Sequence, residues 1–83
     1  MDIYEVLKEK GITLPPAPPK GGLYSSAKEF GDKLVYISGC GCNIGDEVGV
    51  GKLGKEVTVE EGQKWARNSM LNVLSVLDAN VGL

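Results

Sequence analysis

Residues 33–42, KLVYISGCGC, contain an apolar run that stops at Ser-Gly and continues into two thiols separated by one glycine. In an extended chain Leu34 and Tyr36 face one side, and Val35 and Ile37 face the other. Because both sides are apolar, we predict a strand in the centre of a sheet. The Ser-Gly-Cys that follows would then lie where this strand ends.

The run before this strand, LYSSAKEF (residues 23–30), is also strand-like, and Gly31-Asp32 between the two runs is a turn signal. We therefore expect an antiparallel hairpin. The stretch from Gly39 to Lys55 carries six glycines. It predicts turns, with one short strand at residues 47–50.

The last segment predicts a long amphipathic helix. Thr58, with Glu61 three residues later, forms a capping box, and Gly82 marks the stop. Apolar side chains recur between these residues at helical spacing, and we expect this stripe to lie on a sheet or on another subunit. Its members are Ala66, Met70, Leu71, Val73, Leu74 and Leu77.

The N-terminal part predicts a short helix over residues 2–10 and then an extended connector, LPPAPPKGG (residues 14–22). Four prolines fix φ and remove amide donors there. We divide the chain into this helix and connector, residues 1–22, and the remainder, residues 23–83. The order helix, hairpin, glycine-rich turns and long helix predicts an α+β fold, with the long helix on one face of a hairpin-based sheet.

Composition excludes several classes of function. The 83 residues suffice for one small domain, and nine Lys and Arg against eleven Asp and Glu give a net charge of −2. The basic residues are scattered, so no stripe for nucleic acid is expected. No apolar run is long enough to cross a bilayer, and the acidic start does not resemble a secretory signal. We expect a cytoplasmic protein with reduced thiols.

Two glycine patterns resemble nucleotide-binding loops, and both depart from the requirements. Gly39-Cys40-Gly41 is followed by Gly45, one residue too late for a dinucleotide fingerprint, and no helix is expected there. Residues 49–55 match G-x-x-x-x-G-K, but Glu56 stands where a hydroxyl should bind magnesium. Both stretches are interpreted as glycine-rich turns, and no cofactor is expected.

The thiols of Cys40 and Cys42 leave two interpretations open. The chain has no His and no third Cys, so it cannot supply the four ligands of a structural zinc site. The pair also lacks the C-x-x-C spacing typical of dithiol redox sites. The thiols are then either small buried residues at a strand end or reactive groups in a cleft. The carboxylates of the second half are expected to form a solvated face.

Residues 20–82 resemble the RidA/YjgF family, most clearly over GGLYSSAKEFGDKLVYISGC. The shared features are a Gly-x-Tyr near the first strand, a glycine turn, and an apolar strand ending in Ser-Gly. A glycine-bearing loop and a long helix follow, and Gln63 and Asn72-Val73 fit that helix. The resemblance implies a chorismate-mutase-like α+β fold, a homotrimer and a ligand cleft between subunits.

The resemblance further implies that reactive enamine and imine intermediates are hydrolysed to keto acids and ammonia. Tyr24 matches the cleft tyrosine, and Ser38 and Gly39 match the Ser-Gly, whereas Cys40 replaces a common glutamine. These four are the expected substrate-binding residues, and we assign no catalytic residue. Family members continue with further strands, a second helix and a carboxylate-binding arginine, so we expect this chain to be an N-terminal half. The alternatives are a non-enzymatic metabolite-binding module and an inactive fragment.

Overall fold

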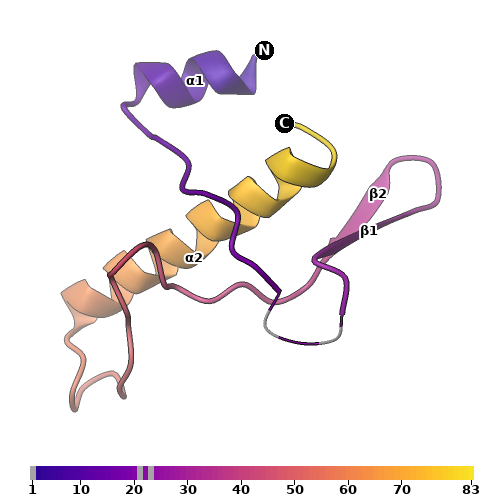
Figure 1. Cartoon of the computed structure of the whole chain (residues 1–83). Coiled ribbons are helices and arrows are strands. Elements are labelled where there is room, and N and C mark those ends of the chain that lie inside the picture. Colours follow the sequence, from indigo (N-terminus) through magenta and orange to yellow (C-terminus); the bar gives the residue numbers. More distant parts are fainter. Residues whose placement is uncertain (1, 21, 23) are drawn as a thin grey trace.

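The computed structural model of the chain describes residues 2–20, 22 and 24–83. It contains four elements, α1 (Ile3–Glu9), β1 (Ala27–Phe30), β2 (Leu34–Ile37) and α2 (Val59–Asn80). The two strands form an antiparallel hairpin, and α2 packs against both of them (Figure 1). This arrangement confirms the predicted α+β class. No helix among the described residues has the length and apolar character needed to cross a membrane.

Helix α1 confirms the short helix predicted near the N-terminus. The Asp2 side chain accepts a hydrogen bond of 2.9 Å from the Tyr4 amide and so caps the first turn. The Tyr4 hydroxyl donates to Asp78 Oδ1 at 2.6 Å, and it accepts from the Leu83 amide at 3.0 Å. These bonds hold α1 beside the C-terminal end of α2 (Figure 1).

The proline-rich connector contains no helix or strand over residues 12–20, as the sequence predicts. It is tied to α2 by a hydrogen bond of 2.7 Å from Ser75 Oγ to the Pro15 carbonyl oxygen. Ser75 is buried at this contact. Proline supplies an acceptor but no amide donor, so a side-chain hydroxyl on the helix satisfies the connector. Gly21, within the predicted connector, lies outside the described residues.

The hairpin is shorter than predicted. Ala27 pairs with Ile37 and Phe30 pairs with Leu34, and the Ser38 amide adds a bond of 3.0 Å to the Ser26 carbonyl oxygen. The turn includes a glycine, Gly31, with a φ of 64°. Leu23, where we expected the first strand to begin, lies outside the described residues.

The prediction of a central strand is wrong for the described part of the chain, where β2 pairs with β1 alone. Leu34 and Tyr36 are 59% and 70% exposed, whereas Val35 and Ile37 are half-buried. Helix α2 covers one face of the hairpin, and no described element covers the other. The face of β2 that carries Leu34 and Tyr36 is therefore apolar and in contact with solvent.

The predicted short strand at residues 47–50 is also wrong. An isolated bridge between Ile44 and Glu47 is the nearest structure to it, with Gly45 at a φ of 57° between them. The Gly49 amide donates to Asn43 Oδ1 at 3.3 Å and not to a neighbouring strand. A side chain thus takes the hydrogen bond that a strand ladder would need.

Helix α2 begins at the predicted capping box, in which the Thr58 hydroxyl accepts from the Glu61 amide at 3.1 Å. Its most buried face differs from the predicted apolar stripe, because Ala66 and Met70 are exposed. The buried residues of α2 are mostly polar: Asn68, Asn72, Ser75 and Val76. This face lies against the connector and the glycine-rich loop, whose carbonyl groups need hydrogen-bond donors.

Candidate functional site

A pocket of about 180 Å³ opens where the end of β2 meets the connector and α2. It is lined by all four residues that the sequence predicts as substrate-binding, Tyr24, Ser38, Gly39 and Cys40. The other lining residues come from the connector, the residue before β1, the glycine-rich loop and α2: Pro18, Pro19, Lys20, Ser26, Gly41 and Val76. The fold therefore brings segments far apart in the sequence to one hollow, which we call the strand-end pocket.

Ser38 stands where β2 ends, and its polar groups are engaged with the segment that precedes β1. Its hydroxyl donates to the Ser25 carbonyl oxygen at 2.6 Å, and its amide donates to the Ser26 carbonyl oxygen. The hydroxyl proton is thus used within the hairpin. Ser38 can offer a ligand the two lone pairs of its hydroxyl oxygen, which accept rather than donate.

The two thiols lie in different surroundings. Cys40 Sγ donates to the Ser38 carbonyl oxygen at 3.5 Å beside the strand-end pocket. Cys42 Sγ is 3.5 Å from the Gly49 carbonyl oxygen, away from that pocket. Both are free and half-buried. No group of three or more Cys, Asp or Glu side chains in the described part of the chain is arranged to hold a metal ion.

The backbone beyond β2 supplies further polar groups. The amides of Gly39, Cys40 and Gly41 donate to no other described residue. All three residues line the strand-end pocket. Unpaired amides in succession at a concave surface are suited to oxyanions and carbonyl oxygens.

Lys20 is a pocket residue that the sequence analysis did not select. It is exposed and forms no ion pair with a described residue. No carboxylate lines the pocket, and Lys20 is the one lysine or arginine among its described lining residues. In the sequence, Lys20 stands in PPKGG, between the rigid prolines and the tyrosine expected in the site. Only the path of the connector across α2 brings Lys20 to the pocket.

Asn72 supports the loop that borders the pocket. Its side-chain amide nitrogen donates to the Gly41 carbonyl oxygen at 2.9 Å and to the Asn43 carbonyl oxygen at 3.0 Å. Asn72 is 2% exposed, so these bonds lie in a protected environment. It also borders a larger hollow of about 490 Å³ between the prolines and the loop. The described residues that line this hollow include no ionisable side chain, so it is a poorer candidate for chemistry.

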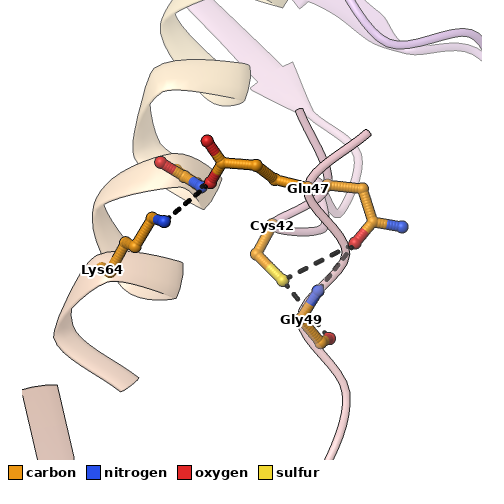
Figure 2. Close-up of polar contacts among 6 residues, drawn as sticks. Cys42, Glu47, Gly49 and Lys64 are labelled. Atoms are coloured by element: carbon orange, nitrogen blue, oxygen red, sulfur yellow. Dashed lines mark hydrogen bonds and ion pairs between the residues drawn. The ribbon is translucent and has the colours of Figure 1, made fainter. Parts of the chain in front are cut away.

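Farther along, the loop is held to α2 by charged and polar contacts (Figure 2). Glu47 pairs with Lys64 at 3.0 Å, and Asn68 Nδ2 lies 3.5 Å from the same carboxylate oxygen. The hydrogen bond and positive charge of Lys64 lower the pKa of Glu47 below its ordinary value of 4.5. This carboxylate is therefore a structural anchor, and it lies outside the strand-end pocket.

The segment that resembles a phosphate-binding loop is a glycine-rich turn, as predicted. The Lys52 amide donates to Glu56 Oε2 at 2.9 Å, so a carboxylate of the chain occupies a backbone donor that a phosphate would need. Leu53 and Val57 form an isolated bridge. The Gly54 amide donates to the Val57 carbonyl oxygen and the Lys55 amide to the Lys52 carbonyl oxygen, so these donors are also used within the turn.

No protein-family model, no curated protein and no solved structure matches this chain. The fold and the strand-end pocket are therefore the basis for any proposal about function.

Proposed function

We propose that this chain belongs to a RidA-like protein of chorismate-mutase-like fold, which hydrolyses reactive enamine and imine intermediates to keto acids and ammonia. The observation that carries the proposal is the convergence of Tyr24, Ser38, Gly39 and Cys40 on the strand-end pocket. The family resemblance selects these residues from sequence pattern alone. Their common pocket is what a ligand-binding role would require.

The chemistry needs water at the imine carbon and a proton on the departing nitrogen. The water oxygen adds to the carbon, its protons pass to nitrogen, and the carbon–nitrogen bond breaks to release ammonia. The free amides of Gly39 and Cys40 would orient the substrate's oxygen atoms. The Ser38 oxygen would accept a hydrogen bond from the imine nitrogen or from the water. Most of the acceleration would come from positioning, since no carboxylate is among the described residues that line the pocket.

The proposal includes a homotrimer with the pocket at a boundary between subunits. The uncovered apolar face of the hairpin, with Leu34 and Tyr36 exposed, supports this assembly. A partner subunit on that face would give β2 the two covered faces that its sequence pattern predicts. It would also bring further side chains to a pocket that is now open to solvent.

A specific observation favours a second candidate, a non-enzymatic module that binds small metabolites. Arg67, the single arginine, lies on α2, is exposed and does not line the pocket. Cys40 also stands in place of a common family glutamine, and its thiol donates to the Ser38 carbonyl oxygen. A pocket without a strong base or a bidentate cation is better suited to binding than to turnover.

The deciding experiment measures imine hydrolysis by the protein purified from its native source. A short-chain 2-imino acid is generated in the cuvette by an amino-acid oxidase, and ammonia release is compared with and without the protein. The deaminase proposal expects acceleration that Tyr24→Phe reduces and that Tyr4→Phe, a tyrosine outside the pocket, leaves unchanged. Release at the solvent rate, together with thermal stabilisation by the keto acid, would favour the binding module.

A further inference from the structure

We propose that the larger hollow, between the connector and the glycine-rich loop, binds a neutral cyclic amide whose N–H group donates to the side-chain oxygen of Asn72. We call this hollow, of about 490 Å³, the connector hollow. Asn72 does not line the strand-end pocket, and the inference requires no reaction, so it does not rest on the proposed function. The described lining of the connector hollow comprises residues 15–19, Gly41, Asn43, Ile44, Gly45 and Asn72.

The side-chain amide of Asn72 is held in one orientation, and its oxygen has no donor. Its nitrogen donates to the carbonyl oxygens of Gly41 and Asn43, so both of its N–H groups are used. No described residue donates to its oxygen. That oxygen is not fully enclosed, because no enclosed side-chain oxygen or nitrogen among the described residues lacks a partner. Since Asn72 is 2% exposed and lines the connector hollow, its oxygen is an acceptor that opens into this hollow.

Backbone groups of the loop supply donors at the same hollow. The amides of Gly41, Asn43 and Gly45 donate to no other described residue, and all three residues line the hollow. Gly41 and Asn43 also contact the Asn72 side chain through their carbonyl oxygens, so these donors belong to residues beside the free acceptor. A ligand with one donor and one acceptor in adjacent positions complements this wall. A ring holds its amide bond cis, which places the N–H and the C=O on the same side.

The other walls suit an uncharged ligand with an aliphatic body. Four prolines, Ala17 and Ile44 present apolar surface. The described lining contains no Lys, Arg, Asp or Glu, so a charged group would lose water there without gaining a counterion. The prolines have fixed φ angles, and the bond from Ser75 to Pro15 ties their segment to α2, so this wall is preformed. The hollow has roughly sixteen times the volume of one water molecule in the liquid, which accommodates a cyclic amide fused to a second ring.

The test uses the cyclic dipeptide of leucine and proline, which is neutral and has one N–H group, and the matched ester in which oxygen replaces that N–H. Calorimetry measures the binding of each to the intact protein. We expect the amide to bind roughly five- to tenfold more tightly, because the ester leaves the protected Asn72 oxygen unpaired. The preference should persist in about 1 M salt, since no charge takes part. Asn72→Ala should remove the preference. Ala17→Phe, which fills part of the hollow, should weaken both ligands, and Ala79→Phe, at an exposed alanine of α2 outside it, should weaken neither.

The inference is overturned if the unchanged protein binds amide and ester equally or binds neither, or if folded Asn72→Ala retains the preference. A circular-dichroism melt shows whether each variant is folded. If Asn72→Ala is unfolded, the unchanged protein and Ala17→Phe decide the question. A preference for the amide that Ala17→Phe weakens and Ala79→Phe does not would support the connector hollow, whereas undiminished binding by Ala17→Phe would overturn it. Imine hydrolysis is measured separately, so either proposal can fail without the other.

Discussion

The side-chain amide of Asn72 donates to the carbonyl oxygen of Gly41 at 2.9 Å, and this bond fastens the loop beyond β2 to helix α2. The same nitrogen reaches the Asn43 carbonyl oxygen at 3.0 Å. One buried amide thus satisfies two backbone acceptors that would otherwise lack donors. Because Gly41 follows Cys40 directly, the bond also positions one wall of the strand-end pocket.

We predict that Asn72→Ala lowers the free energy of unfolding by roughly 2–3 kcal/mol, because two protected carbonyl groups lose their partner. The measurement is urea unfolding followed by circular dichroism. The matched control is Asn80→Ala on the same helix. Asn80 is exposed and makes one bond to the Val76 carbonyl oxygen, so its loss should cost less than about 1 kcal/mol. Equal losses for the two variants would show that the loop does not depend on Asn72.

A second prediction concerns Gly49, which lies between the indole of Trp65 and the thiol of Cys42. A Cβ atom on residue 49 would lie 2.6 Å from Trp65 Cδ2 and 2.8 Å from Cys42 Sγ. Gly49→Ala should therefore displace the indole and destabilise the protein by roughly 1–3 kcal/mol. Trp65 is the single tryptophan, so its fluorescence reports the displacement directly. Gly41→Ala, where a Cβ meets no atom within 4 Å, should leave the emission unchanged.

The capping box of α2 predicts loss of stability in acid. Hydrogen bonds from the Thr58 amide and hydroxyl lower the pKa of Glu61 below its ordinary value of 4.5. A carboxyl whose pKa is lower in the folded state contributes stability above its unfolded pKa. That contribution disappears as the pH falls through the folded pKa. The pKa of Glu47 is also lowered, by Lys64, so this carboxylate likewise contributes stability that is lost in acid.

The free energy of unfolding should therefore decline below pH 4.5. Glu61→Gln keeps an acceptor for the cap but does not titrate, so its decline should be shallower. Urea unfolding at several pH values measures both curves. Parallel curves for the two proteins would remove Glu61 as a source of the pH dependence. At neutral pH, Thr58→Ala should cost about 1 kcal/mol through loss of the cap.

A further prediction concerns assembly through the uncovered face of the hairpin. Leu34→Lys should weaken the proposed trimer, because it places a charge on the exposed apolar face that we propose a partner subunit covers. Sedimentation velocity over a range of concentrations measures the change. Val50→Lys changes a residue that is 81% exposed in the glycine-rich loop, outside the hairpin, and should not alter the distribution. A trimer that persists with Leu34→Lys would place the subunit contact elsewhere.

Local signals in the sequence determined both helices and the hairpin. Asp2 and Thr58 cap the two helices, and Gly31 forms the turn between the strands. These features act within a few residues, so they can be identified without knowing what packs where. The predicted site residues Tyr24, Ser38, Gly39 and Cys40 came from a family pattern, and the fold brings them to one pocket.

Only the tertiary structure decided which face of α2 is buried and which cation stands beside the pocket. The apolar stripe through Ala66 and Met70 predicted the wrong buried face of α2. The buried face instead carries Asn72 and Ser75, because carbonyl oxygens of the loop and the connector accept hydrogen bonds from them. Lys20 reached the pocket because the connector crosses α2. Both outcomes depend on contacts between residues more than 30 positions apart, which hydrophobic periodicity does not encode.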